Sequence, residues 1–108
     1  MNEAQVDATF RALSDPTRRA VIQRLCVGPA SMTELSQPFP IKLPTFSKHL
    51  DVLEECGLVK STKVGRVRTY RLVPKRLTQA EDWLSKQRRA WERRLDQLDE
   101  YLKTMTEE

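Results

Sequence analysis

The chain has 108 residues, of which 19 are Lys or Arg and 15 are Asp or Glu, so that its net charge is +4. That length suits a single domain over 1–108, and a hydrophobic share of 39% argues against a wholly disordered chain. No apolar run approaches the roughly 18 residues of a membrane span, and the first residues lack the features of a signal peptide. Because the chain has only two cysteines, we expect reduced thiols and a cytoplasmic protein that contacts no membrane.

The first part of the chain predicts two helices separated by a sharp break. Apolar residues recur at helical spacing over 4–13, which favours a short amphipathic helix. Asp15 can cap the next helix, and Pro16 suits its first turn because the missing N–H is not needed there. We expect this second helix to end at Gly28 and Pro29, a left-handed stop followed by a helix breaker.

A capping box and a second break predict two further helices. Ser31 and Glu34 stand three residues apart, so that the hydroxyl and the carboxylate can each satisfy a backbone N–H near the other residue. The helix that they open is short and closes at Gln37–Pro40. A longer helix is predicted over 44–57. Its apolar stripe comprises Phe46, Leu50 and Leu53.

After this helix the pattern changes to that of a β-hairpin. The segments 58–63 and 66–72 are rich in β-branched and aromatic residues, and the Val64-Gly65 pair between them predicts a tight turn. The hairpin carries five cations and no acidic residue: Lys60, Lys63, Arg66, Arg68 and Arg71. Since side chains alternate along a strand, Arg66 and Arg68 should point to the same face near the tip.

The short third helix, the break and the longer helix have the form of a helix-turn-helix over 31–56. In that motif the second helix presents its N-terminal residues to base edges in the major groove of DNA. Cations on a projecting hairpin over 58–73 can reach phosphates or a minor groove and release condensed counterions. The alternative is a solvated surface hairpin with scattered cations. Because the hairpin directly follows a helix-turn-helix, DNA binding is favoured over this alternative.

A long final helix is predicted over 78–105, which contains neither Gly nor Pro. Apolar residues follow steps of three and four along it and are too many to leave exposed. With two residues of the first helix they form the expected dimer interface: Phe10, Leu13, Leu84, Trp91, Leu95, Leu98 and Leu102. The alternative is that this stripe covers the chain's own core, which is too small to use all of it. Arg88 interrupts the stripe and should pair with an acidic residue across the interface or lie at its edge.

Four segments, taken together and in this order, carry a family resemblance. They are Ala12–Arg19, Leu43–Leu50, Leu53–Val59 and Gly65–Leu72. They resemble the ArsR/SmtB family of winged-helix transcriptional repressors. The resemblance implies a mainly α fold, a winged helix-turn-helix with a two-stranded β-hairpin wing and a long C-terminal dimerisation helix. It also implies a homodimer, paired through the first and last helices, that binds an inverted-repeat operator and responds to an inducer, often a metal ion.

The same resemblance makes the helix over 44–56 the recognition helix. The residues expected on DNA are Lys42, Leu43, Pro44, Thr45, Ser47, Lys48 and His49, together with Lys63, Arg66 and Arg68 of the wing. We expect Thr45, Ser47 and Lys48 in the major groove, because hydroxyl and ammonium groups can hydrogen-bond base edges. Lys42 should contact a phosphate.

Some of these positions have alternative roles. Many relatives begin this helix with polar residues where the chain has Leu43 and Pro44, and contact with a thymine methyl is one replacement. The hydroxyl of Ser47 could instead bond back to its own helix. For His49, a packed or phosphate-contacting role is favoured over catalysis.

The residues at the family's usual metal positions do not suit a metal. The arsenic-type site is a Cys-x-Cys pair on the third helix, but residues 33–37 contain no sulfur. The zinc-type site uses His and carboxylates of the last helix, which has no His. We read Glu81, Asp82 and Asp96 as solvated acids facing basic residues one turn away. No cofactor and no metal are therefore expected, and the inducer is not specified.

The two cysteines, Cys26 and Cys56, leave a thiol-based redox-sensing repressor open as an alternative. Both lie at predicted helix ends, where a free cysteine is by default buried as a small hydrophobe. A disulfide between them would require Cα atoms within about 7 Å of each other.

Two classes of function remain. The first is a homodimeric, sequence-specific regulator of transcription that binds double-stranded DNA, as a repressor in the first instance. The second is a winged-helix module that binds a protein partner. The basic hairpin and the polar face of the recognition helix favour the first class. An enzyme is excluded, because the chain offers one His, no Gly-rich phosphate loop and no nucleophile–base pair.

Overall fold

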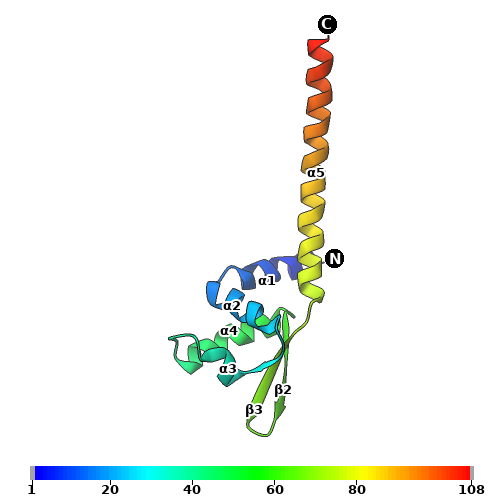
Figure 1. Ribbon diagram of the computed structural model, residues 1–108. Helices are drawn as coiled ribbons and strands as arrows, with labels where there is room; N and C mark the ends of the chain where they lie inside the picture. The colour runs from blue at the N-terminus through cyan, green and yellow to red at the C-terminus, as the bar shows by residue number, and fades with distance from the viewer. Residues whose placement is uncertain (1, 108) are drawn as a thin grey trace.

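The computed structural model describes residues 2–107, and in this part of the chain it contains five helices and three strands (Figure 1). In chain order they are α1 (Glu3–Leu13), α2 (Pro16–Leu25), β1 (Ala30–Ser31), α3 (Met32–Ser36), α4 (Leu43–Glu55), β2 (Val59–Val64), β3 (Val67–Leu72) and α5 (Lys75–Thr106). α3 and α4 form the helix-turn-helix, and the hairpin of β2 and β3 forms the wing. The predicted fold class, a mainly α winged helix-turn-helix with a long C-terminal helix, is confirmed.

Local side-chain chemistry starts the helices where the sequence predicts. The carboxylate of Asp15 accepts a hydrogen bond from the N–H of Arg18 at 3.0 Å. Ser31 and Glu34 form the full capping box, with both hydrogen bonds at 3.1 Å. α2 ends at Leu25, earlier than predicted, because the N–H groups of Val27 and Gly28 bond to carbonyls three residues back and tighten the last turn.

The end of α4 requires a glycine. Gly57 has a φ of +84°, and the N–H groups of Gly57 and Leu58 bond to the carbonyls of Glu54 and Leu53 at 3.1 and 3.0 Å. This is a Schellman motif, in which a left-handed residue lets the chain turn back and satisfies two carbonyls of the helix end. A Cβ at Gly57 would lie 3.0 Å from Nε of Arg76. The turn therefore sets where the wing leaves the recognition helix.

The sheet has one strand that the sequence did not predict. β1 pairs with β3, so that the antiparallel sheet has the order β1-β3-β2, with Ala30 opposite Tyr70. The position of the hairpin turn was also predicted wrongly. Val64 pairs with Val67, which leaves Gly65 and Arg66 as the two loop residues. Gly65 has a φ of +62°, and Gly at the first of two loop positions is the preference of a type II′ turn.

The core lies between the helices and the inner face of this sheet. The apolar stripe of α4 is completely buried, as predicted, and meets Val21 and Leu25 of α2 and Tyr70 of β3. The other members are Ala12, Ile22, Ala30, Leu35, Leu58 and Val59. Because every element before α5 contributes a buried side chain, the recognition helix is fixed on one side by packing and free on the other.

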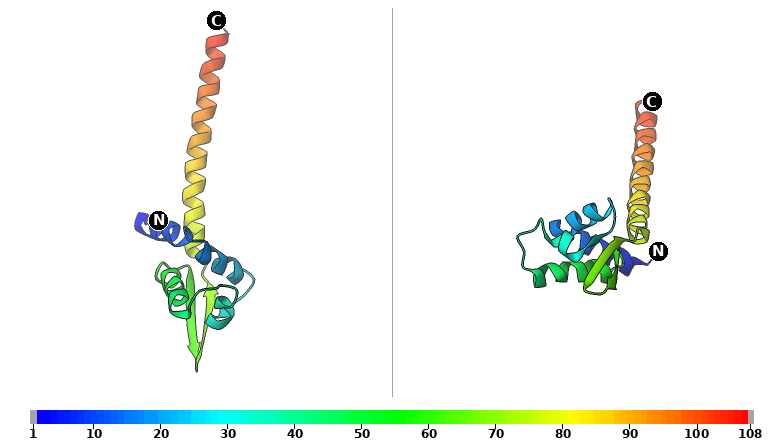
Figure 2. Two further views of the ribbon diagram at one scale, coloured as in Figure 1. Left: turned by 90° about the vertical axis from the view of Figure 1, so that its left-hand side faces the viewer. Right: turned by 60° about the horizontal axis from the view of Figure 1, so that its bottom comes forward.

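α5 begins at Lys75, where Pro74 occupies the cap position, and its first turns pack against α1. The rest of the helix projects far beyond the other elements (Figures 1 and 2). The molecule therefore measures 76 × 28 × 23 Å, with a radius of gyration of 20.2 Å, whereas a compact chain of this length would have about 13 Å. No helix in residues 2–107 is long and apolar enough to cross a membrane.

Candidate nucleic-acid interface

α4 presents a packed face and an open face. Phe46, Leu50 and Leu53 have no exposed surface, so the helix cannot turn about its axis without opening the core. Most of the predicted DNA contacts on this helix and its cap are exposed: Lys42, Leu43, Pro44, Thr45 and Lys48. Ser47 and His49 are half-buried. The structure therefore presents the start of α4 to solvent and holds its end in the domain.

The N-terminus of α4 lacks the side-chain cap that the three preceding helices have. Asn2, Asp15 and Ser31 cap α1, α2 and α3 through their side chains. Lys42, at the same position of α4, makes no such hydrogen bond. The unpaired N–H groups and the positive end of the helix dipole, next to the Lys42 ammonium, favour an anion such as a phosphate.

His49 packs against α2. Its Nδ1 lies 3.1 Å from Nη1 of Arg18 and 3.8 Å from Oδ2 of Asp15. The same guanidinium donates hydrogen bonds to the carbonyls of Ala12 and Arg11 at 2.6 and 3.2 Å. Arg18 thus joins the end of α1, the start of α2 and the recognition helix. No local pattern in the sequence indicates a role for Arg18, because the partners of its side chain lie in two other helices, α1 and α4.

The groups around Asp15 change the pKa of its carboxyl group. Slight burial would raise its pKa, but the N–H of Arg18 and the nearby His49 and Arg18 side chains outweigh that effect. The pKa of Asp15 therefore lies below its ordinary value of 3.8. The folded state favours the carboxylate, which is also the form that caps α2.

The strand register places the wing cations in like-charged pairs. Lys63 lies opposite Arg68, and Lys60 lies opposite Arg71. Like charges directly opposite each other destabilise an antiparallel pair. All four side chains are exposed, and the hairpin has no acid to neutralise them. A polyanion beside the wing would relieve this repulsion.

The corrected turn changes the place of Arg66. Arg66 lies in the loop at the tip of the wing and not on β3, so the prediction that it shares a strand face with Arg68 is wrong. Arg68 shares its face with Lys63 and with the buried Tyr70, because both strands alternate from the pair of Ser61 and Tyr70. Arg66 is thus the cation that extends furthest from the core along the hairpin.

A polar network that sequence reasoning missed connects α4 with the wing. The carboxylate of Glu54 accepts hydrogen bonds from the hydroxyl of Ser61 at 2.8 and 2.9 Å, and from its N–H at 3.2 Å. Arg68 in turn donates to the Ser61 hydroxyl at 2.9 Å. The sequence could not indicate this link. Which of the neighbours Glu54 and Glu55 faces the hairpin depends on the orientation of the helix and on the strand register, and neither is known from the sequence.

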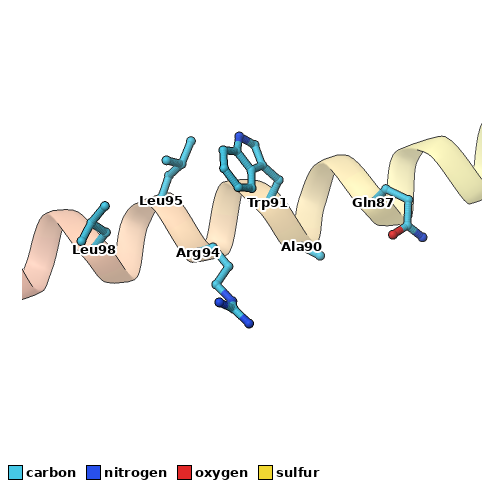
Figure 3. A pocket seen from close by; sticks show the side chains of 6 residues that line it. All are labelled: Gln87, Ala90, Trp91, Arg94, Leu95 and Leu98. Carbon is cyan, nitrogen blue, oxygen red and sulfur yellow. The ribbon is translucent and has the colours of Figure 1, made fainter.

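The predicted dimer residues of α5 are exposed along most of the helix. Leu84, Trp91, Leu95, Leu98 and Leu102 keep 43–65% of their surface open. Figure 3 shows Trp91 and Leu95 together on one edge of the helix, with Arg94 on the opposite edge of the view. The stripe does not cover the chain's own core, since Ala80 is the one buried α5 residue in the part of the chain that the structure describes. Arg88 pairs with Glu92 of the same helix at 3.8 Å.

The two α1 candidates of the dimer interface are partly buried. Phe10 lies edge-on to Trp83 of α5, with ring centroids 5.8 Å apart. Leu13 packs against the hydrophobic core. The aromatic pair fixes the first turns of α5 beside α1, so the direction of the projecting stripe follows from the fold of the winged part.

The cysteines occupy different surroundings. Cys26 is exposed, contrary to the expected burial of a small hydrophobe, whereas Cys56 is half-buried and donates to the carbonyl of Leu53. Burial raises the pKa of the Cys56 thiol, which disfavours the reactive thiolate. Both thiols are free. Within residues 2–107 no three His, Cys, Asp or Glu side chains gather in a way that could hold a metal ion.

Known proteins share both this sequence and this architecture. Residues 13–62 match a family described as a helix-turn-helix domain. The chain is 41% identical over 68 residues to the HTH-type transcriptional regulator Rv2034 of Mycobacterium tuberculosis, which covers 63% of this chain and 64% of Rv2034. The match thus spans just under two thirds of that relative. The transcriptional repressor SdpR of Bacillus subtilis is 29% identical over 75 residues, or 69% of this chain and 83% of SdpR.

A solved structure decides the family. The crystal structure of an ArsR family transcriptional regulator, RHA00566, matches with a TM-score of 0.83 and 44% sequence identity, over 85% of this chain and 95% of that chain. The chain belongs to the ArsR/SmtB family. The predicted resemblance is therefore confirmed, and with it the assignment to DNA-binding transcriptional regulators and not to enzymes.

Proposed function

We propose that this protein is a homodimeric, sequence-specific repressor that binds an inverted-repeat operator through α4 and the wing. The arrangement of cations on the wing carries the proposal. Two like-charged pairs, Lys63 with Arg68 and Lys60 with Arg71, stand in register on a hairpin that has no acid. Such an arrangement costs stability in the free protein and gains it beside a phosphate backbone.

In this proposal the open face of α4 recognises the base sequence of the operator. Thr45, Ser47 and Lys48 would contact base edges in the major groove, and Lys42 with the uncapped helix N-terminus would hold a phosphate. Lys63, Arg66 and Arg68 would follow the backbone or enter the minor groove. α3, α4 and the wing lie together at the end of the molecule opposite the C-terminus of α5, which supports one continuous DNA-facing surface (Figures 1 and 2).

A second copy of the chain would cover the stripe of α5. Leu98 lies about five helical turns beyond the buried Ala80 and thus on the same face of the helix. The face that packs against α1 at the base therefore continues as an uncovered apolar stripe, which a soluble monomer rarely leaves open. A twofold axis would set two recognition helices about 34 Å apart, which matches half-sites one turn of DNA apart.

Repression would follow from occupancy of the operator. The likeness to SdpR, which is named a transcriptional repressor, supports repression over activation. The proposal assigns no inducer and no metal. The exposed thiol of Cys26 is 30 residues from that of Cys56 in sequence, and a redox response would need one of them to change DNA affinity on oxidation.

The direct test is binding of the purified protein to the intergenic DNA upstream of its own gene, at two salt concentrations and with random DNA as competitor. We expect a saturable complex that survives the competitor and contains two protomers. Complexes that random DNA removes equally well would contradict sequence-specific binding and would favour the alternative of a protein-binding module. Peroxide added to the same assay tests the redox alternative, for which we expect unchanged affinity.

A further inference from the structure

The polar network between α4 and the wing has charged groups at both ends. The hydroxyl of Ser61 has one proton, and through it the hydroxyl donates a hydrogen bond to the carboxylate of Glu54, whose oxygens lie 2.8 and 2.9 Å away. The same hydroxyl oxygen accepts a hydrogen bond from Nη1 of Arg68 at 2.9 Å. Hydrogen bonds with an ionised partner are about twice as strong as neutral ones, and linked bonds strengthen each other. Ser61 is thus a bridge between an acid on the recognition helix and a cation on the wing.

This network lies at the end of the part of the hairpin that the sheet and the core hold in place. β1 pairs with β3 only at Ala30 and Ser31, opposite Tyr70 and Thr69. Beyond that point the hairpin continues to its tip with exposed side chains on both faces. Glu54 contacts the hairpin at Ser61, opposite Tyr70, and so marks the last place at which the wing is held to the helix that enters the groove.

A carboxylate so close to a DNA-facing surface has an electrostatic cost. It repels phosphates, and removal of any nearby acid should by charge alone strengthen DNA binding. Glu55, the next residue, is exposed and would show that effect by itself. The hydrogen bonds that the hydroxyl and the N–H of Ser61 donate to Glu54 point to a benefit that offsets the charge, and that benefit is the placement of the Arg68 guanidinium.

We propose that Glu54 is a positioning residue that, through Ser61, fixes Arg68 and the angle of the wing relative to α4. The recognition helix and the wing then engage DNA as one rigid unit, and the ordering of Arg68 is completed before binding. This inference rests on the proposed function, since it explains how two DNA-contacting elements keep a fixed spacing.

The test compares two variants of equal charge, Glu54→Gln and Glu55→Gln. We expect Glu55→Gln to bind operator and random DNA as well as the wild type or slightly better. Glu54→Gln should bind both operator and random DNA roughly 5–10-fold more weakly, the order expected for one lost charge-assisted hydrogen bond, because a phosphate contact from Arg68 carries no sequence information. Its salt slope on the operator should fall by about one, because Arg68 is no longer held for its phosphate.

Further variants separate positioning from simple folding. Ser61→Ala should reproduce the effect of Glu54→Gln, and the double variant should be no worse than either single one. Ser61→Thr, which keeps the hydroxyl, should retain wild-type affinity. In the free protein, amide hydrogen exchange at Ser61 should accelerate in Glu54→Gln and stay unchanged in Glu55→Gln, with equal melting temperatures showing that the core is intact.

The outcomes distinguish this inference from the function on which it rests. If the wild type shows no preference for operator DNA, the proposed function is contradicted and the positioning role with it. If the wild type prefers the operator and the two Gln variants bind it equally, with equal salt slopes and equal exchange at Ser61, the positioning role alone is overturned.

Discussion

The winged part of this protein and the far half of α5 use apolar residues in opposite ways. From α1 to β3 most large apolar side chains of the helices and of the inner sheet face pack into one core, and three of four helix N-termini are capped by side chains. Along α5, a stripe lies on the face that packs against α1 at the base, yet nothing in residues 2–107 covers it. The stripe comprises Trp91, Leu95, Leu98, Leu102 and Met105. The winged part encloses its own core, whereas we propose that a second copy of the chain covers the stripe of α5.

This difference shows that the same apolar stripe on a helix can face the protein's own core or remain uncovered. The stripe of α4 and the stripe of α5 have the same helical spacing, and spacing alone does not distinguish a buried stripe from an uncovered one. What separates them is the surrounding chain. α4 is enclosed by α2, α3 and the sheet, while α5 extends past every element that could cover it (Figure 1). Variants in each stripe therefore test whether the stripe of α4 serves the core and the stripe of α5 serves a second copy.

The largest effect is expected from opening the core. Leu50→Ala should cost about 2–5 kcal/mol of unfolding free energy, because a cavity remains in a fully buried site. Since Leu50 contacts no partner, the loss should be independent of protein concentration. Leu102→Ala should instead lower the melting temperature by an amount that changes with protein concentration, since binding of a second copy stabilises the folded state by mass action. Thermal unfolding at two concentrations checks both, and concentration-independent loss in Leu102→Ala would contradict the comparison.

A charge within the α5 stripe should have the next largest effect. Leu98→Asp should convert the protein to monomers in sedimentation and weaken operator binding by at least about 100-fold, because the two half-sites are then no longer bound by one linked molecule. Gln97→Asp is the matched control, since it adds the same charge one residue away on a different face of the helix. If Leu98→Asp remains a dimer, or if both variants behave alike, the stripe is not the interface.

Variants of the DNA-facing surface should separate base contact from phosphate contact. Lys48→Ala should weaken operator binding by about 1–3 kcal/mol and random DNA binding by less, as expected for a contact to a base edge. Arg66→Ala should weaken both alike and lower the salt slope by about one. Fluorescence anisotropy over a salt series measures both quantities, with Lys103→Ala on α5 as the control. Wild-type affinity in both variants would contradict the proposed docking.

The smallest effect concerns acid stability of the winged part. The folded state lowers the pKa of Asp15, so its carboxylate stabilises the fold above the ordinary pKa of 3.8, and that contribution is lost as the pH falls through the folded-state value. Asp15→Asn keeps a capping side chain but cannot titrate, so the stability difference between wild type and variant should shrink below about pH 4. Chemical denaturation at pH 3 and pH 7 measures this difference. A constant difference would show that Asp15 has equal pKa values in the folded and unfolded states.

The features that sequence predicts here are local, and those it misses are contacts between distant segments. The caps at Asp15 and Ser31 and the stripe of α4 follow from spacing within one helix. The short strand β1 has only two residues, and it is a strand only through its pairing with β3, where Ala30 lies opposite Tyr70. The turn lies at Gly65 and Arg66, one residue later than predicted, because Gly65 takes the loop position that requires a positive φ. The partners of Arg18 and Glu54 depend on helix packing, which no local pattern indicates.

Selection of bound sequences from a pool of random DNA examines α4 and α5 together, because an enriched inverted repeat requires both the open face of α4 and two chains paired through α5. The account predicts enrichment of an inverted repeat whose half-sites have centres about one turn of DNA apart, with loss of the second half-site for Leu98→Asp. Enrichment of a single asymmetric site by the wild type, or of no sequence at all, would contradict the account.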